Sequence, residues 1–572
     1  MKKNYIYIVA LTLVMGLITG CNFLDKNPDL RASINSKEKV QLLLVSAYTP
    51  ASFGPICEFS SDQVVDNNAP DKAGHCNSLN ALDRMYDEIF AWEVIKSDGE
   101  QDSPKYIWDG CYRAIATCNQ ALKAIEELEE QGYKMDAERG EALISRAYHH
   151  FILANVFCQS WKDATQSKQD LGITYMTEPE TKVAPEYERG NLYDTYKHIE
   201  EDLEAGLPLV SDEYYTIPRY HFNVKAAHAF AARFYLYTRQ WPKVIEHANK
   251  VLTEDDATVL ANLYDASQGS INDPEIEQLA WYDASRTYNL LLNATMTQAP
   301  YTVIPSYGRY AHNGTAADLS SLGSGPCWSG MFPGYPHWQY KKEYGCFCAK
   351  CLWLFEYTDK VNGYGYIHSV TRAFNTNETL LCRAEAKIYM NDFDGAVNDF
   401  RMWCQGYNGY SDGMSTLEDG TVDLTLAKIK KFYRADSEYC PELHNTDMSP
   451  EFIITEDQKP LVWCALHFRR IETVHDGLRW FDLKRYGIEI THQRGKEALR
   501  TLVWNDDRRA IQLPIDVMIA GMTPNPRVIV GDQVSPSSAT AVTEPVGEVE
   551  PATWPKVDAG IGISIHEEDK EE

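Results

Sequence analysis

The chain has 572 residues, of which 44% are hydrophobic and 24% charged, a composition typical of a large globular protein with an ample core. Its 54 lysines and arginines are outnumbered by 82 aspartates and glutamates, giving a formal net charge of -28 at pH 7. A surface this acidic repels nucleic acid and anionic lipid headgroups, so we expect no nucleic-acid partner.

The first twenty residues have the pattern of an export signal. Lys2 and Lys3 precede an apolar run from Ile6 to Ile18, which is too short to span a bilayer comfortably. Small residues then lead directly to Cys21, and the segment resembles a bacterial lipobox. The pattern predicts that Cys21 becomes the acylated first residue, because several acyl chains anchor a protein stably where one does not. The alternative is an ordinary cleaved signal with Cys21 merely nearby.

A lipidated tether, residues 21–36, follows the leader. Residues 37–48 are the first amphipathic helix candidate. Residues 49–88 form a long polar segment that contains Asp66 and Asn67. A structureless stretch of this length is unusual in a compact domain unless it has a function.

Helical spacing of apolar residues predicts the scaffold. The predicted helical segments are 106–128, 139–161, 191–209, 225–252 and 378–403. Two of them share a finer spacing, in which a small residue, an aromatic residue and a packing residue are separated by nine and then seven positions. The two sets are Ala232, Trp241 and Ala248, and Ala384, Phe393 and Phe400. The spacing resembles degenerate tetratricopeptide units, so we expect a mainly α fold of helical pairs whose long insertions carry the ligand surface.

Residues 253–377 break the helical period and are rich in aromatic residues. They include Trp281, Tyr307, Trp328 and Trp338. A flat indole or phenol ring covers the C–H face of a sugar, and the polar tip of Tyr or Trp suits a site that faces water. Most aromatic side chains in proteins lie in the core, so we expect two or three of the candidate rings to be exposed at a site.

A charged helix candidate, residues 468–487, stands near the end of the chain. Phe468, Ile471, Val474, Leu478 and Phe481 form one apolar stripe at spacings of three and four. The other positions carry many charges of both signs, a pattern that favours a buried or interfacial polar network. A glycine at position 477 interrupts the helix and predicts a bend or a close backbone approach.

This stretch resembles the C-terminal signature of the SusD/RagB family of outer-membrane lipoproteins, which is associated with nutrient binding at the surface of Bacteroidetes-type cells. The residues that carry the resemblance are Arg469, Arg470, Glu472, Asp476, Gly477, Arg479, Phe481, Asp482, Leu483, Lys484, Arg485, Tyr486 and Gly487. Near the start of the mature chain, Phe23, Leu24, Asp25 and Pro28 are also similar to the family. His475 and Tyr486 depart mildly from its usual pattern.

The resemblance implies a ligand surface and partners. Family members take their ligand contacts from the loop before the first helical hairpin and from the long middle insertion. The candidate ligand-binding residues are therefore Trp92, Asp66, Asn67, Trp281, Tyr307, Trp328 and Trp338. The implied ligand is an oligosaccharide, with a peptide as the alternative, and the implied partner is a SusC-like TonB-dependent transporter. The protein would be held at the cell outer membrane by its lipid alone.

Catalytic and metal sites have little support. The motifs HExxH, GxxxxGK[ST], GxSxG and GxGxxG are absent, and 82 acidic residues nominate no pair for glycoside hydrolysis. We therefore expect no catalytic residue, cofactor or metal, and a surface glycosidase is the less favoured alternative. Cys346, Cys348 and Cys351 form a cluster without a fourth ligand nearby, so one or two disulfides of unknown pairing are favoured over zinc.

These patterns divide the chain into six parts. They are a lipoprotein signal peptide at 1–20, a lipidated tether at 21–36, an N-terminal SusD-like helical region at 37–252, a loop-rich aromatic insertion at 253–377, a C-terminal SusD/RagB-type region at 378–530, and a tail at 531–572. The tail is rich in Pro, Ser and Thr and ends in EEDKEE, which favours disorder or a surface extension.

Overall fold

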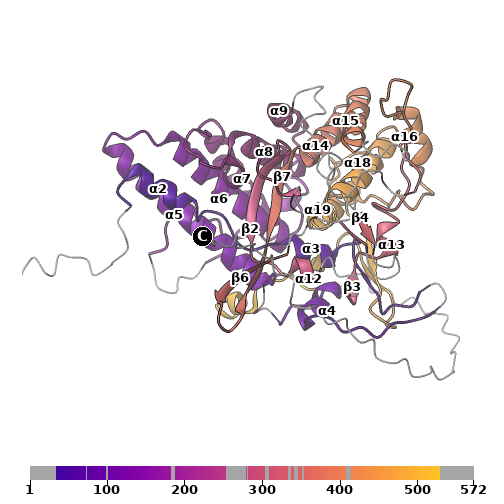
Figure 1. Cartoon of the computed structure of the whole chain (residues 1–572), viewed down its shortest axis with the longest axis horizontal. Helices are drawn as coiled ribbons and strands as arrows, with labels where there is room; N and C mark the ends of the chain where they lie inside the picture. Colours follow the sequence, from indigo (N-terminus) through magenta and orange to yellow (C-terminus); the bar gives the residue numbers. More distant parts are fainter. Residues whose placement is uncertain are drawn as a thin grey trace, which may run out of the picture.

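Helices placed side by side make up most of the molecule (Figure 1). The computed structural model describes residues 34–528, except for 72–73, 98, 100, 182–186, 253–278, 280, 303–307, 331, 333–336, 340–345, 349, 351–352 and 408–413. The predicted leader, Cys21, the tether up to residue 33 and the tail from 531 lie outside the described residues. In the part that is described, no helix is both long and apolar enough to cross a membrane.

The N-terminal helices lie at one end of the row. They are α2 (Lys37–Leu44), α5 (Pro104–Glu130), α6 (Asp136–Phe157) and α7 (Leu192–Gly206). Polar residues start three of them, since Ser36, Ser103 and Asn191 each accept a hydrogen bond from a backbone N–H of the first turn. The predicted helical segments here are confirmed, with ends shifted by a few residues.

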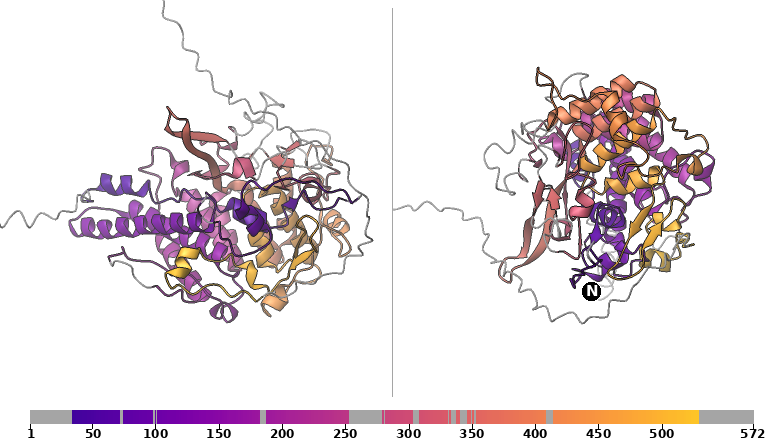
Figure 2. Two further views of the ribbon diagram at one scale, coloured as in Figure 1. Left: turned by 90° about the horizontal axis from the view of Figure 1, so that it is seen from below. Right: turned by 90° about the vertical axis from the view of Figure 1, so that its right-hand side faces the viewer.

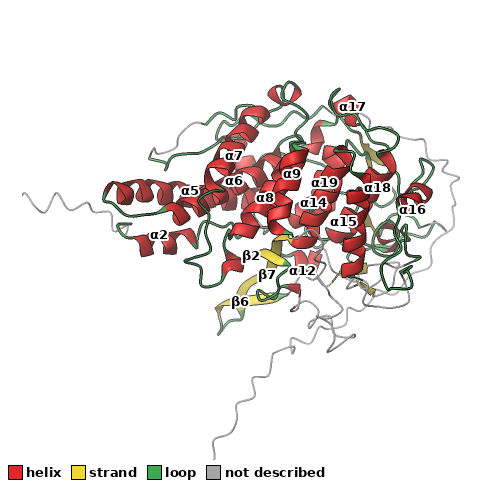
Figure 3. Cartoon of the chain, turned by 90° about the horizontal axis from the view of Figure 1, so that it is seen from above, coloured by secondary structure: helices red, strands yellow, loops and turns green. Residues whose placement is uncertain are grey.

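Two helical pairs continue the row and confirm the tetratricopeptide-like spacing. They are α8 (Val224–Tyr237) with α9 (Trp241–Val251), and α14 (Thr376–Tyr389) with α15 (Phe393–Gly406). Ala232 and Ala384 are fully buried where the helices of each pair cross. Figure 3 shows these pairs in sequence from α8 to α15, so the mainly α scaffold of helical pairs is confirmed.

The charged stretch folds into two helices, α18 (Lys459–Glu472) and α19 (Leu478–Arg485). Gly477 precedes α19 with φ of 75°, a left-handed conformation that favours glycine. A Cβ at this position would lie 2.8 Å from Cα and 2.9 Å from O of Gly54. The predicted close backbone approach is therefore confirmed, and it joins the C-terminal helices to the N-terminal part of the chain.

The charges of this stretch form a buried network, as predicted. Asp482 accepts hydrogen bonds from Arg469 (Nε to Oδ2, 2.9 Å) and from Arg485 (Nη2 to Oδ1, 2.7 Å). Arg469 also pairs with Glu378 of α14, and Arg485 with Glu385 of the same helix. Arg469, Asp482 and Glu378 have no exposed surface. The network therefore fixes α18 and α19 against α14 with directional contacts inside the core.

The polar segment 49–88 is more structured than its composition predicts. It contains α3 (Gly54–Ser60), the short strand β1 (Val65–Asp66) and the start of α4 (Arg84–Phe90). All seven residues of α3 are buried. These helices were missed because a seven-residue helix buried on every side shows no amphipathic period.

A three-stranded antiparallel sheet lies on one face of the helical row (Figures 1 and 2). Its order is β2 (Asn289–Thr295), β7 (Tyr364–Asn375) and β6 (Leu354–Asp359). The second half of β7 pairs with β2, whereas its first half pairs only with β6. The β6–β7 hairpin therefore extends beyond β2 and projects from the body in all views.

Short elements complete the described chain. The helices are α12 (Ala299–Thr302), α13 (Gly314–Ala317), α16 (Leu426–Phe432), α17 (Asn445–Met448) and α20 (Ile515–Ile519); the strands are β3 (Tyr310–Ala311), β4 (His337–Gln339), β5 (Cys346–Cys348), β8 (Ile490–His492) and β9 (Arg500–Leu502). The ten cysteines whose side chains are described are free thiols, with Cys327 and Cys404 in contact at 3.8 Å between their sulfur atoms. The expected disulfides are therefore not found among them.

Candidate functional site

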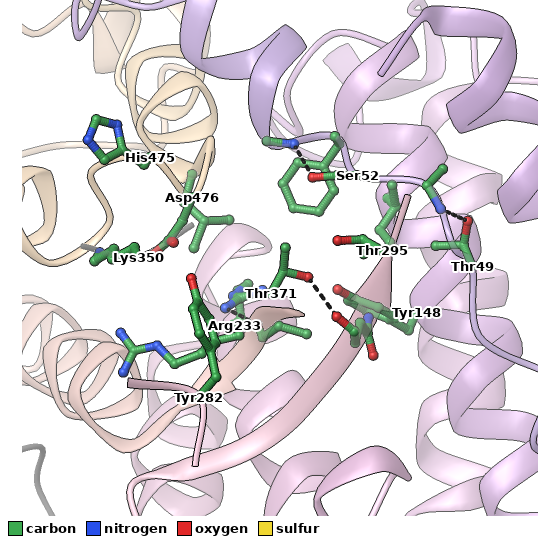
Figure 4. A pocket seen from close by; sticks show the side chains of 18 residues that line it. Thr49, Ser52, Tyr148, Arg233, Tyr282, Thr295, Lys350, Thr371, His475 and Asp476 are labelled. Carbon is green, nitrogen blue, oxygen red and sulfur yellow. Dashed lines mark hydrogen bonds and ion pairs between the residues drawn. The ribbon is translucent and has the colours of Figure 1, made fainter. Parts of the chain in front are cut away.

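A polar pocket lies where the sheet meets the helices (Figure 4). Its walls come from the loop before α3, from α6 and α8, from β2 and β7, and from the turn before α19. The polar residues labelled there are Thr49, Ser52, Tyr148, Arg233, Tyr282, Thr295, Lys350, Thr371, His475 and Asp476. Its volume is about 60 Å³, which suits a few water molecules and is far below the roughly 300 Å³ of small ligand sites. The pocket is too small for a sugar ring.

A larger groove of about 690 Å³ lies beside α4 and β9, and we call it the Trp92 groove. It is lined by Arg84, Glu88, Ala91, Trp92, Glu93, Val94, Lys96, Glu497, Ala498, Leu499, Arg500, Arg508 and Arg527. Its volume is in the range of small-ligand sites. The groove brings the end of the N-terminal polar segment together with the C-terminal region.

Trp92 is held rigidly at this groove. Its φ is 54°, an uncommon conformation for a bulky residue. The His492 ring stacks on Trp92 (centroids 4.3 Å apart) and on Phe90 (4.1 Å), and the indole Nε1 donates to the carbonyl oxygen of Ser60 at 3.0 Å. The side chain is only 5% exposed, so Trp92 contributes to the groove wall without presenting an open ring face.

Exposed aromatic side chains gather on the projecting hairpin. Phe355 and Tyr357 share one face of β6, and Trp353, directly before the strand, continues the same alternation; we call the three residues the aromatic row. Trp353 is 47% and Tyr357 54% exposed. The Trp353 and Phe355 rings are 6.2 Å apart with planes at 23°, and Phe355 meets Tyr357 edge-on at 4.8 Å.

The partner strand adds rings on the other face of the hairpin. Tyr366 pairs with Glu356, so its side chain lies on the opposite face from Phe355 and Tyr357. Tyr364 and Tyr366 are 70% and 54% exposed. Both faces of the hairpin therefore carry exposed aromatic side chains, and exposed apolar side chains that gather in one place favour an interaction site. The sequence signal was the alternation of aromatic residues at 353, 355 and 357 and again at 364 and 366, which is typical of a strand with one aromatic face.

The other predicted tryptophans lie in the interior where they are described. Trp281 is 1% exposed, with the Arg372 guanidinium 3.6 Å from its ring centroid. Trp328 is 4% exposed and donates from Nε1 to the carbonyl oxygen of Gly323. Both rings therefore serve packing in this conformation. Tyr307 and the side chain of Trp338 lie outside the described residues, so their role stays a prediction.

Asp66 and Asn67 connect the two predicted ligand regions to each other. Asp66 Oδ2 accepts from Nη2 of Arg309 at 3.0 Å and from the backbone N of Gly495 at 2.9 Å. Asn67 donates from Nδ2 to the carbonyl oxygen of Gly308 and accepts from Nδ2 of Asn313. Both side chains are buried, so they hold the N-terminal segment against the middle insertion.

Comparisons with known proteins agree with this architecture. Residues 22–236 match the SusD-like family that is described as starch-binding and associating with the outer membrane. The N-terminal part of the chain is therefore similar to the SusD-like family, and the fold agrees with that likeness. No curated protein matches the sequence.

Solved structures resemble this protein over most of its length. A SusD superfamily protein from Bacteroides vulgatus is 17% identical, with a TM-score of 0.51 over 85% of this chain and 97% of that one. A putative sugar binding protein from the same species is 16% identical, with a TM-score of 0.54 over 87% and 99% of the two chains. A SusD superfamily protein from Bacteroides thetaiotaomicron is 13% identical, with a TM-score of 0.53 over 86% and 98%. At these identities the likeness establishes the fold.

A buried acid beside the polar pocket gives the stability of the protein a pH dependence. Glu58 accepts from the backbone N of His475 at 2.8 Å, and its Oε2 has no hydrogen-bond partner among the described residues. Burial raises the pKa of Glu58 to about 8 and lowers the pKa of His475 to about 3. Both side chains are therefore neutral at pH 7, although their nearest atoms are 3.6 Å apart.

We expect Glu58→Gln to remove this pH dependence. A carboxyl with a raised pKa in the folded state stabilises fully below the unfolded value of 4.5 and loses that contribution as the pH rises to about 8. The free energy of unfolding of the native protein, measured by urea titration at pH 5 and pH 8, should fall relative to that of the variant. The matched control is Glu456→Gln, because the side chain of Glu456 is 88% exposed. This substitution should leave the pH dependence of the free energy of unfolding unchanged. If the free energy of unfolding depended on pH in the same way for the native protein and for Glu58→Gln, the raised pKa of Glu58 would be contradicted.

Proposed function

We propose that this protein is a SusD-like cell-surface lipoprotein that binds an oligosaccharide on the aromatic row and delivers it to a SusC-like TonB-dependent transporter. The observation that carries the proposal is the exposure of the aromatic row on a hairpin that projects from the scaffold. The family description as starch-binding and the sugar-binding relative support the ligand class. The signal sequence and Cys21 support lipid anchoring.

The geometry of the aromatic row suits the faces of successive sugar rings. Residues two apart on a strand are about 6.7 Å apart, which is on the scale of a sugar ring. Each exposed aromatic ring offers flat apolar area that a sugar can cover with its C–H face.

The test is binding by the double variant Trp353→Ala, Tyr357→Ala. Each lost ring should weaken binding about tenfold, since roughly 1.4 kcal/mol corresponds to a factor of ten and stacked aromatic contacts contribute about that much. Calorimetry against a panel of neutral and acidic oligosaccharides, with a peptide digest as a further arm, measures the change. Circular dichroism should be unchanged, because the row lies outside the core.

The matched control is Tyr133→Ala, which removes a 49% exposed ring from the turn between α5 and α6. It should leave saccharide binding intact. Binding of peptides alone would favour a peptide-binding lipoprotein, and loss of intact oligosaccharide during incubation would favour a glycosidase. Purification from detergent extracts without a barrel transporter, from cells grown on glycan, would contradict the delivery step.

A further inference from the structure

The charge of the Trp92 groove is opposite in sign to that of the whole molecule. The groove is lined by five cationic side chains, Arg84, Lys96, Arg500, Arg508 and Arg527, and by three carboxylates, Glu88, Glu93 and Glu497. In the whole chain the acidic residues outnumber the basic ones by 82 to 54. A locally basic groove on an acidic molecule concentrates positive potential at one place.

The three carboxylates of the groove are already engaged. Glu88 pairs with Arg84 (Nε to Oε1, 3.2 Å), and its Oε2 also accepts from the backbone N of Lys96 at 2.7 Å. Glu93 and Glu497 both pair with Arg500, at 3.5 and 3.4 Å. Arg494, which lies outside the groove lining, also pairs with Glu497 at 2.8 Å and with Glu93 at 3.8 Å. The negative charge of the three carboxylates is thus largely compensated by neighbouring arginines.

Arg508 pairs with Asp506 at 2.8 Å, so two of the five cations remain without a carboxylate within ion-pair distance among the described residues. The exposed Lys96 has no acidic side chain within ion-pair distance among the described residues. Arg527 donates only to the carbonyl oxygens of Asp507, Ala510 and Pro526, and its buried Nε has no hydrogen-bond partner among the described residues. Positive charge is therefore left over beside an apolar wall, to which Val94 and the exposed Leu499 contribute together with the edge of Trp92.

We propose that the Trp92 groove binds the carboxylate or sulfate group of an acidic oligosaccharide. The inference rests on the proposed glycan binding and names the class of glycan. The anionic group lies near Lys96 and Arg527 and neutralises their positive charge. A sugar ring of the same ligand contacts the apolar wall beside them. The volume of about 690 Å³ accommodates a short saccharide. Because the molecule as a whole is acidic, recognition depends on these short-range contacts, and added salt weakens it.

The test compares saccharides that differ only in charge. One pair is oligogalacturonate and its methyl ester, and the other is a chondroitin sulfate oligosaccharide and its desulfated form. We expect the full mature chain to bind the charged member of at least one pair about tenfold more tightly or better in calorimetry, with the preference shrinking at high salt. The two pairs distinguish a carboxylate from a sulfate.

Lys96→Glu reverses the uncompensated charge and should abolish the preference. Lys123→Glu, on an exposed position of α5, makes the same charge change away from the groove and should keep it. Equal binding of charged and uncharged members in both pairs would overturn the inference while the proposed glycan binding stood. A preference that survives Lys96→Glu would place the anion elsewhere and also overturn it. Failure of every saccharide to bind would remove the proposed function and this inference together.

Discussion

Asp482→Asn should lower the free energy of unfolding by about 3–5 kcal/mol, because it removes the shared anion between two buried arginines. Arg469 and Arg485 have no water to replace the lost charge, since the exposed fractions of their side chains are 0% and 7%. Each keeps one glutamate of α14, but the neutral amide accepts only weakly from either guanidinium. Urea unfolding followed by circular dichroism measures the loss.

The control for this substitution is Asp457→Asn. Asp457 pairs with Lys430 at the surface, where the two side chains are 74% and 41% exposed, and such pairs contribute about 1 kcal/mol or less. If Asp457→Asn and Asp482→Asn lowered the free energy of unfolding equally, burial of the Asp482 network would add nothing to its stabilising effect.

Acid should erase the difference between the native protein and Asp482→Asn. Burial alone would raise the pKa of Asp482, but the guanidinium groups of Arg469 and Arg485 more than offset it and lower the pKa below its usual 3.8. A carboxyl with a lowered pKa stabilises above its unfolded value and loses that contribution as the pH falls through the folded value. The two unfolding free energies should therefore converge below pH 3.8, and a constant gap would contradict the mechanism.

Gly477→Ala should cost about 2–5 kcal/mol. A left-handed backbone costs a non-glycine residue roughly 1–2 kcal/mol, and overpacking adds roughly 1–3 kcal/mol. The added Cβ would meet backbone atoms of Gly54 within 3.0 Å, and backbone cannot turn aside as a flexible side chain can. Thermal or urea unfolding gives the value.

Gly363→Ala separates the two causes. Gly363 lies in the exposed turn of the β6–β7 hairpin with φ of 72°, close to the value at Gly477, but nothing lies within 4 Å of its added Cβ. Gly363→Ala should lower the free energy of unfolding only by the cost of the left-handed backbone, about 1–2 kcal/mol. If Gly477→Ala lost no more than Gly363→Ala, the close approach between the two chain segments would have no energetic role.

The helical scaffold was predictable because its signals are local. The spacing from Ala232 through Trp241 to Ala248 spans only seventeen residues, which include the end of one helix, the turn and the helix that packs back against it. The buried charges were also predictable, because opposite charges at helical spacing beside Trp480 and Phe481 favour a network inside the protein. Both are properties of short stretches of sequence.

The ligand surface was harder to predict because exposure is decided by distant contacts. Trp281 and Trp353 are alike in sequence as tryptophans within an aromatic insertion. Arg372, ninety-one positions after Trp281, covers the first ring, whereas Trp353 directly precedes β6 of the projecting hairpin and is 47% exposed. The candidates chosen from the sequence therefore included the buried Trp281 and omitted Trp353, although aromatic residues alternate at 353, 355 and 357.

The contacts of Asp66 set an order of assembly. Its carboxylate joins Arg309 and Gly495, which lie 243 and 429 positions later in the chain. Helical pairs such as α8 and α9 need only neighbouring sequence and can form early, whereas closures over such long separations are slow. The end of the molecule that holds the Trp92 groove is therefore completed last, after nearly the whole polypeptide has emerged, so a chain that stops before residue 495 would have its scaffold but lack the finished groove.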